Sequence, residues 1–378
     1  MTNANAPRAA YVHVPFCRRR CGYCNFTVVA ERDDLVEAYL HAIELELQQL
    51  QVPRAVDTLF FGGGTPTQLS PAALERLCQS TRHWFPSSGD YEFSVEANPA
   101  DLDSPRLNVL QAAGVNRLSL GGQSFDDGKL ERLERDHRRS RLEQTIAACR
   151  PRFASLALDL IFAVPGETLA TWQADLAAAI AAGVDHISTY GLTFERGAAF
   201  WGRLQRGQLQ PVGEERERDM YEAAIDTLTA AGFEHYEVSN FARPGHRCRH
   251  NEVYWRGEAY DAVGPGAARY VDGWRETNHR STTTYLKRVF AGQSPVAERE
   301  RLAPADAARE RLVFGLRMME GVARSPFAGA TGFEIDALVG DALRRFVDQG
   351  LLEDTGSRIR LTRAGLLVSD AIWPAFLA

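Results

Sequence analysis

Lysine is almost absent from this chain of 378 residues, which carries it only at Lys129 and Lys287. Nearly all of the 43 basic residues are therefore arginine, a preference that we attribute to coding bias rather than to phosphate binding. The chain also lacks an excess of basic residues, because 49 acidic residues outnumber them and the formal net charge is −6. A dedicated nucleic-acid-binding protein usually shows the opposite balance, so we expect no nucleic-acid partner.

Long apolar segments are missing as well, and no run approaches the roughly 18 residues that suggest a transmembrane helix. The first ten residues are polar and contain no apolar core of the signal-peptide type. We therefore expect a cytoplasmic protein that is not an integral membrane protein, with its six cysteines reduced. Cys17, Cys21 and Cys24 fall within eight residues, a spacing typical of a metal site rather than of a disulfide framework.

The first half of the chain alternates between short β-rich runs and segments with helical periodicity. This alternation predicts βαβ units and a parallel sheet, and six such units suit an incomplete barrel. We expect strands at residues 10–14, 56–61, 91–95, 115–120, 156–162 and 186–190. The main intervening helices are expected at residues 35–50, 71–84, 141–149 and 169–182.

Candidate motifs follow the first five of these strands, at residues 15–26, 62–66, 96–99, 121–125 and 164–168. In parallel α/β folds the chemistry collects in loops after the C-terminal ends of the strands. The five motifs should therefore meet at one end of the sheet. Ser70 and Pro71 together are a good helix start, with a capping hydroxyl and a proline at the first helical position.

The C-terminal part has a different pattern, in which two helices, a hairpin and a last helix from Thr362 form a winged-helix-like unit. It shows no basic recognition stripe, so we expect a lid or a partner surface rather than a DNA-binding domain. The predicted domains are a barrel over residues 1–232, a connecting region over 233–300 and the winged-helix-like domain over 301–378.

The cysteine spacing, C-x3-C-x2-C, lets one loop present three thiolates to a compact inorganic centre. A structural zinc site usually has four ligands in two separated pairs, and His13 is a nominal fourth ligand, although it lies on a predicted strand. An iron–sulfur cluster usually takes four thiolates, and a four-iron cluster with only three keeps one iron free for another ligand. The companion motifs favour the cluster over zinc.

Tyr11-Val-His-Val-Pro-Phe-Cys17, followed by Cys21-Gly-Tyr23-Cys24, resembles the opening of radical S-adenosylmethionine (SAM) proteins in the coproporphyrinogen-oxidase-like branch. The resemblance covers essentially the whole chain. It implies a partial (β/α)6 radical SAM barrel, a [4Fe-4S] cluster on the three cysteines, and SAM chelated to the free iron. The cofactor carries the radical chemistry in such proteins, while the protein orients it.

The same resemblance implies cofactor-binding roles for residues that follow several strands. Gly63, Gly64 and Thr65 belong to a Gly-Gly-Gly-Thr-Pro loop, whose exposed amides we expect to meet the methionine moiety of SAM. Glu96 resembles the residue that binds the ribose hydroxyls. Further matches to positions around the SAM pocket are Tyr11, Tyr23, Gln123, Arg135, Asp159, Thr193 and the Val164-Pro165-Gly166 loop.

Each of these residues also has an ordinary structural interpretation. A glycine triplet after a strand can be simply a tight turn, and Glu96 can be a solvated or ion-paired carboxylate. Arg135 lies beside other charged residues and can form a surface ion pair. Several matched positions serve a second SAM molecule in the oxidases, so the number of SAM molecules stays open.

Within the branch, two departures count against an oxidase. Asn25-Phe26 stands where the oxidases carry a further cysteine, and the cysteine loop begins earlier in this sequence than in theirs. The segment His250-Asn-Glu-Val-Tyr254-Trp255 has the H-N-x-x-Y-W pattern of HemW-like haem chaperones. The resemblance implies that His250 is an axial ligand of haem b, that Tyr254 and Trp255 flank the porphyrin, and that Cys248 lies near the haem.

These observations predict a haem chaperone that binds a [4Fe-4S] cluster, SAM and haem, with no catalytic residue assigned. The expected partners are haem and apo-haemoprotein acceptors, membrane-associated haemoproteins among them, and a homodimer is a candidate assembly. The alternative is a radical SAM oxidoreductase that acts on coproporphyrinogen III or a related tetrapyrrole.

Overall fold

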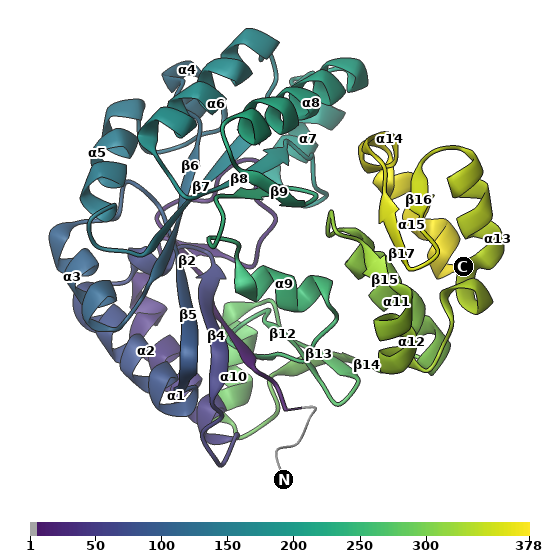
Figure 1. The fold of residues 1–378 in the computed structure, drawn as a ribbon. Coiled ribbons are helices and arrows are strands. Elements are labelled where there is room, and N and C mark those ends of the chain that lie inside the picture. The colour runs from purple at the N-terminus through teal and green to yellow at the C-terminus, as the bar shows by residue number, and fades with distance from the viewer. Residues whose placement is uncertain (1–5) are drawn as a thin grey trace.

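A nine-stranded sheet forms the core of the computed structural model, which describes residues 6–378. Its order is β11-β1-β4-β5-β6-β7-β8-β10-β9 (Figure 1), with parallel pairing from β11 to β8 and antiparallel pairing at β10 and β9. Strands β11 and β9 are its two edges, so the sheet stays open. The bounds are β1 Ala9–Val14, β4 Val56–Gly63, β5 Ser87–Ala97, β6 Arg117–Gln123, β7 Ser155–Phe162, β8 His186–Gly191, β9 Glu234–Glu237, β10 Asn240–Ala242 and β11 Asp261–Val263.

All six predicted strands are present, as β1, β4, β5, β6, β7 and β8, and the predicted partial α/β barrel is confirmed. The three additional strands of the sheet, β9, β10 and β11, come from the region that we expected to connect two domains. They have only three or four residues each, which is too short for periodicity to reveal. The division of the chain at residues 232 and 300 stays a prediction.

Helices cover the outer face of the sheet (Figure 1). The predicted helix at residues 71–84 is α2, and its cap is confirmed, because the Ser70 hydroxyl accepts a hydrogen bond from the Ala73 amide at 3.2 Å. The helices of this part are α1 Val36–Gln48, α2 Pro71–Trp84, α3 Ser104–Ala112, α4 Asp127–Arg132, α5 Arg139–Cys149, α6 Leu169–Ala182, α7 Ala199–Gln205 and α8 Glu214–Ala230.

The two faces of the sheet differ in polarity. The outward side chains of β4 and β5, such as Leu59, Phe61 and Phe93, are fully buried and belong to one apolar core with the helices. The inward side chains are largely polar, and on β8 His186 and Ser188 both face the enclosed space. Barrel interiors are usually filled with bulky branched side chains. A polar interior therefore indicates space for water or ligands.

A small three-stranded sheet and α10 follow β11 and pack beside α1. Glu46 of α1 connects this segment to the barrel through its buried carboxylate. The carboxylate accepts hydrogen bonds from the Gly264 amide at 2.9 Å, from Asn278 Nδ2 at 2.7 Å and from the Tyr285 hydroxyl at 2.6 Å. Three donors compensate the cost of burying the carboxylate. The elements are α9 Arg249–Trp255, β12 Ala268–Val271, β13 Trp274–Asn278, α10 Thr282–Phe290 and β14 Val296–Glu300.

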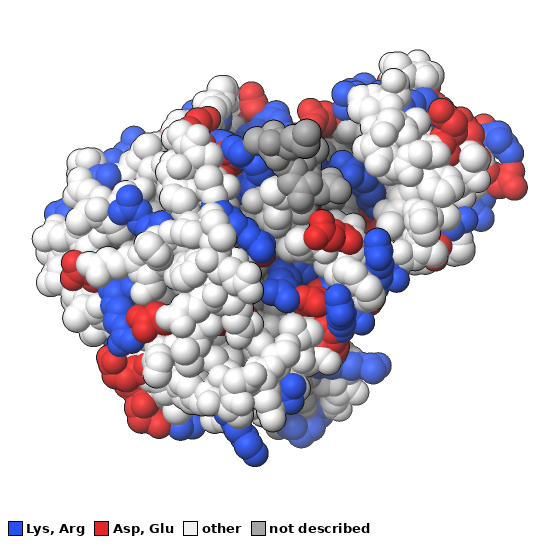
Figure 2. Space-filling model, turned by 90° about the horizontal axis from the view of Figure 1, so that it is seen from below, with Lys and Arg blue, Asp and Glu red and all other residues white. Residues whose placement is uncertain are grey.

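The C-terminal domain is a separate lobe beside the barrel, and acidic and basic side chains are interspersed on the face in Figure 2. Its three-stranded sheet has the order β15-β17-β16. The winged-helix-like prediction missed the short strand β15 and helix α12, and the single last helix that it expected is divided into α14 and α15. The elements are α11 Pro304–Leu316, β15 Val322–Ala323, α12 Arg324–Thr331, α13 Ile335–Asp348, β16 Leu352–Asp354, β17 Arg358–Leu361, α14 Arg363–Leu367 and α15 Ser369–Leu377. Over residues 6–378, no helix combines the length and apolarity needed to cross a membrane.

Candidate functional site

A cleft of about 710 Å³ opens at the C-terminal ends of the parallel strands. The expectation that the strand-end motifs meet at one end of the sheet is confirmed for the cysteine loop and for the loops after β4, β5 and β6. Most of the predicted site residues line this cleft, namely Cys17, Cys21, Tyr23, Cys24, Gly63, Gly64, Thr65, Glu96, Gln123, Arg135, Asp159 and Thr193. Tyr11, His250 and the loop at residues 164–166 do not.

The cysteine loop is held at both ends by backbone pairing. Strand β2 (Phe16–Cys17) pairs with β3 (Val29–Ala30), and the Cys24 amide donates to the Cys21 carbonyl at 3.1 Å, which closes a turn between them. All three cysteines are free and partly exposed. Burial raises the pKa of the Cys17 thiol to about 12 and also raises that of Cys24. A bound cation would favour the thiolate forms of Cys17 and Cys24 against this effect of burial.

The donor set fits an iron–sulfur cluster better than a single zinc ion. His13 is not a fourth ligand, because its Nε2 contacts the Thr27 carbonyl at 2.7 Å and its Nδ1 contacts the Tyr11 hydroxyl at 3.1 Å. Within residues 6–378, no three His, Cys, Asp or Glu side chains lie close enough together to hold one metal ion. Thiolates that bind separate irons of a larger centre do not have to meet at one point.

The glycine loop packs tightly against β1 and the cysteine loop. Gly63 has a φ of +106°, and a Cβ there would lie 2.3 Å from the His13 ring. A Cβ on Gly64 would lie 2.7 Å from the Phe16 carbonyl oxygen, so both positions require glycine.

The expectation of exposed amides in this loop is wrong. The amides of Gly63, Gly64 and Thr65 donate to Glu96 Oε2, the Val14 carbonyl and the Phe16 carbonyl at 3.1, 2.8 and 2.7 Å, respectively. The amides are used because the loop extends the pairing of β4 with β1. These three amides are therefore not free to bind a ligand.

Glu96 and Asp159 are two partly buried carboxyl groups on the inner face of the sheet. Burial and the nearby Asp159 charge raise the pKa of Glu96 to about 7, against the hydrogen bond that it accepts from Gly63. Burial also raises the pKa of Asp159, although hydrogen bonds from Ser188 and Ser119 oppose the shift. Neither is a freely solvated carboxylate, so that alternative for Glu96 does not hold.

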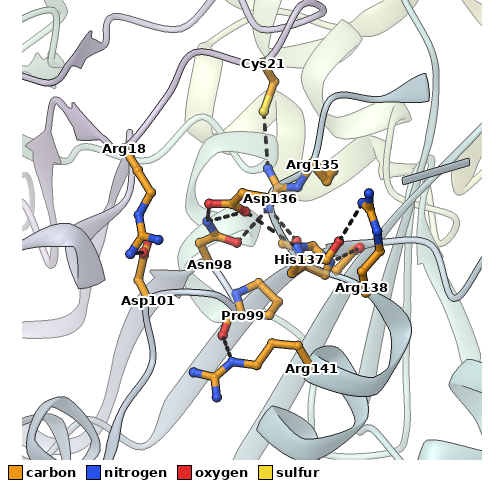
Figure 3. Close-up of polar contacts among 12 residues, drawn as sticks. Arg18, Cys21, Asn98, Pro99, Asp101, Arg135, Asp136, His137, Arg138 and Arg141 are labelled. Atoms are coloured by element: carbon orange, nitrogen blue, oxygen red, sulfur yellow. Dashed lines mark hydrogen bonds and ion pairs between the residues drawn. The ribbon is translucent and has the colours of Figure 1, made fainter. Parts of the chain in front are cut away.

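Arg135 is not a surface ion pair but a link between the cysteine loop and two strand ends (Figure 3). Its Nη1 donates to Cys21 Sγ at 3.5 Å, and its Nη2 donates to Asn98 Oδ1 and the Gly121 carbonyl at 3.0 and 2.8 Å. A guanidinium beside a thiol favours the thiolate. Sequence reasoning missed Asn98, which also donates to Asp136 and so holds this network together.

Gln123 lies in the cleft with a φ of +64°, an unusual conformation for a residue other than glycine. The register between β6 and β7 shifts between Leu120 and Gln123, so the strand bulges at this point. Bulges next to functional sites re-aim side chains. The bulge of β6 therefore lies at Gln123, the residue that resembles a SAM-pocket position and that lines the cleft.

A second cavity, of about 210 Å³, lies inside the curved sheet and shares Glu96, Ser119, Asp159 and Tyr190 with the cleft. Tyr11 lines this chamber rather than the cleft. The sequence interpretation missed the other polar residues of the chamber, Arg117, His186, Ser188 and Asn251.

His250 also faces the chamber and is only 1% exposed. Its Nδ1 and Nε2 contact the Thr58 and Tyr254 hydroxyls, both at 2.8 Å, and burial lowers its pKa to about 3. Haem iron can reach the ring only if α9 or Tyr254 moves. The structure therefore does not present His250 as an open axial ligand, and that role stays a prediction.

The remaining residues singled out from the sequence lie outside the cleft. Cys248 is buried, with its sulfur 3.7 Å from Glu92. Trp255 lines a pocket of about 430 Å³ between α9 and α11, and the Arg317 guanidinium lies 4.5 Å from the centre of its ring. In the loop at residues 164–166, the Val164 amide donates to Glu167, as in an ordinary turn after a strand.

Comparison with known proteins places this chain in a family. The family model described as "Radical SAM superfamily" matches residues 11–179, and the model described as "HemN C-terminal domain" matches residues 302–368. The solved structure of coproporphyrinogen III oxidase (HemN) from Escherichia coli superimposes with a TM-score of 0.86, at 23% identity over 98% of this chain and 90% of that one. The fold and the site thus define a radical SAM protein.

Curated relatives narrow the family. "Heme chaperone HemW" of Bacillus subtilis is 34% identical over 98% of this chain and 99% of its own length, and that of Lactococcus lactis is 33% identical over 98% and 97%. The zebrafish "Radical S-adenosyl methionine domain-containing protein 1, mitochondrial" is 35% identical over 97% of this chain and 86% of its own length. This chain belongs to the HemW family of radical SAM proteins.

Proposed function

We propose that this protein is a cytoplasmic haem chaperone that binds a [4Fe-4S] cluster, SAM and haem, and that delivers haem to apo-haemoproteins. The observation that carries the proposal is the full-length similarity to proteins named heme chaperones, together with three free thiols in one cleft. Phe26, where the oxidases have a further cysteine, supports a chaperone over an oxidase.

Cys17, Cys21 and Cys24 are the proposed cluster ligands, and the iron without a protein ligand is the proposed site for SAM. The reduced cluster supplies the electron that cleaves the sulfonium of SAM when both are bound. The chain itself positions the ligands, because Arg135 contacts Cys21 and the glycine loop lies against β1. Gly63, Gly64 and Glu96 line the same cleft, and the Glu96 carboxylate is suited to the ribose hydroxyls of SAM.

SAM affinity is expected to rise between about pH 6 and pH 8. The pKa of Glu96 is raised to about 7, so its carboxylate ionises in this range and becomes a stronger acceptor for hydroxyl groups. Glu96→Gln should remove the pH dependence and weaken binding at pH 8 by roughly tenfold, as expected for a hydrogen bond to a charged group. Equilibrium dialysis of labelled SAM against the reconstituted protein measures both effects, and an equally steep profile in Glu96→Gln would contradict this role.

Haem binding is tested by titrating haemin into the anaerobically reconstituted protein. We expect a stoichiometric, shifted Soret band at micromolar protein, whereas unshifted free haemin would contradict the proposed function. His250→Ala tests the axial-ligand prediction separately: if His250 ligates the iron, haem bound to the variant should show a different Soret band at saturating protein, and an unchanged spectrum would contradict that role. Tyr254→Phe is the matched control, since it frees His250 Nε2 and keeps the aromatic ring.

A radical SAM oxidoreductase acting on coproporphyrinogen III is the second candidate. It is favoured by the intact set of cleft residues, in which the three cysteines, Glu96 and Arg135 lie together. Incubation of the reduced protein with SAM and coproporphyrinogen III decides between the two. Formation of protoporphyrinogen would establish the oxidase and displace the chaperone.

A further inference from the structure

The most exposed large hydrophobic side chain of residues 6–378 lies at the cleft. Phe26 is 68% exposed and lines the cleft two residues after Cys24. An aromatic ring left in water forfeits the favourable free energy of burial, although a single exposed apolar side chain is by itself ordinary on a protein surface. A flat apolar ligand at the cleft mouth would cover this ring.

Two arginines that line the same cleft as Phe26, Arg19 and Arg20, have no close carboxylate partner. The nearest carboxylate of Arg19 is Glu134 at 4.0 Å, and Arg203 binds that carboxylate more closely, at 2.7 Å. Arg20 donates to the Cys24 carbonyl at 3.2 Å and has no ion pair within the described residues. This rim of the cleft, formed by Phe26, Arg19 and Arg20, therefore holds two cations without a close ion pair, beside the acidic Glu134 and Glu195 that line the same cleft.

Two further arginines show how the rim is built. Arg280 comes from a distant part of the chain and donates to the Asn25 carbonyl at 2.7 Å and to Thr27 Oγ1 at 3.1 Å. Arg18, by contrast, folds back onto Asp101 at 2.9 Å (Figure 3). The loop is therefore anchored through Arg18 and Arg280, while Arg19 and Arg20 remain available for a ligand.

The geometry points to the cleft mouth as the haem-docking site, with one face of the macrocycle on Phe26 and the propionates on Arg19 and Arg20. This inference rests on the proposed haem-binding function and says where that binding occurs. Aromatic rings stack favourably with offset faces, and arginine binds carboxylates through charge-assisted hydrogen bonds. Because the cleft of about 710 Å³ also has to hold the proposed cluster and SAM, the macrocycle is placed at its exposed mouth rather than inside it.

The other cavities fit haem less well. The chamber beside His250 measures only about 210 Å³ and is lined by polar groups. The pocket beside Trp255 measures about 430 Å³, but its Arg275 already binds Glu300 and Glu310 at 2.9 and 2.5 Å. Neither cavity pairs an exposed aromatic face with unpaired cations as the rim does.

The test compares haemin affinities of full-length, cluster-loaded variants by Soret titration. Phe26→Ser and Arg19→Glu/Arg20→Glu should each weaken binding roughly tenfold or more. Phe290→Ser is the matched control for the ring, because Phe290 is exposed on α10 away from the cleft. Arg344→Glu on α13 is the control for charge. Both controls should bind like the wild type.

Haemin dimethyl ester, which lacks the two carboxylates, separates the ring from the charges. The charge-reversal variant should bind the ester as well as the wild type does, while Phe26→Ser should bind it weakly. Iron and sulfide are measured in every sample. If Phe26→Ser loses its cluster, Phe26→Leu, which keeps the apolar bulk but not the flat face, takes its place.

Failure of this inference is distinct from failure of the proposed function. If the wild type binds haemin and the Phe26 and arginine variants bind it equally well, haem docks elsewhere. That result contradicts the proposed docking site but not the proposed haem-binding function. If the wild type shows no haem-specific Soret band, the proposed function falls with it.

Discussion

Replacing Cys21 by alanine will abolish the brown iron–sulfur absorption while the protein stays folded. The proposed cluster has only three protein ligands, so the loss of one leaves two thiolates for four irons. The side chain of Cys21 is partly exposed and contacts chiefly Arg135, so its removal leaves little cavity. Iron bound after anaerobic reconstitution should fall from about four per chain to well below one, and Cys17→Ala and Cys24→Ala should behave alike.

Cys78→Ala and Cys149→Ala provide the control for this prediction. Both cysteines are buried in helices α2 and α5, and burial raises the pKa of each thiol to about 12. They are ordinary core residues, so their variants should keep full cluster absorption. Retention of the cluster in Cys21→Ala, or its loss in Cys78→Ala, would contradict the proposed ligand set.

Much of the site was predictable because parallel strands place their following loops at one end of a sheet. Once the strands were located, the positions of Gly63, Glu96 and Gln123 at one cleft followed from topology alone. The cysteine loop was predictable for a different reason, since three thiols within eight residues cannot lie far apart. The helix start at Ser70 followed from local capping chemistry.

The polar interior of the sheet was not predicted, although its signal is visible in the sequence. Polar residues recur at every second position on β5, at Glu92, Ser94 and Glu96, and on β8, at His186 and Ser188. A run that alternates in this way has one face for the core and another for something polar. The alternation therefore predicts a polar inner face of the sheet as well as the strands themselves.

Other features depend on contacts between distant segments, which a single sequence does not reveal. The amides of the glycine loop are bound by Glu96 and by carbonyls of β1 and β2, and the imidazole of His250 is enclosed by Thr58 and Tyr254. A motif states which residue types are present but not which atoms remain free. The role of His250 is therefore the prediction that the structure supports least.

The largest change in stability is expected from Lys129→Met. The Lys129 ammonium is fully buried and lies 2.5 Å from Glu167 and 2.9 Å from Asp175. Removing one partner of a buried ion pair leaves an uncompensated charge, so the free energy of unfolding should fall by about 3–5 kcal/mol. Burial raises the pKa of Glu167, while the charge of Lys129 lowers it. Without Lys129 the pKa of this carboxyl should therefore rise further, so that it binds a proton more readily. Denaturant unfolding followed by circular dichroism measures the loss.

Lys287→Met is a matched control, because Lys287 is the only other lysine of the chain and is exposed on α10. Its replacement should change the free energy of unfolding by less than about 0.5 kcal/mol. Adding Glu167→Gln to Lys129→Met should recover part of the loss, since it removes one of the unpaired carboxylates.

Asp175 also accepts hydrogen bonds from Ser124 and the Phe125 amide, both at 2.7 Å, directly after Gln123. The Lys129 variant should therefore also loosen the bulge of β6 at the cleft and weaken SAM binding. Equal stability of the two lysine variants would show that the buried network contributes nothing to the fold.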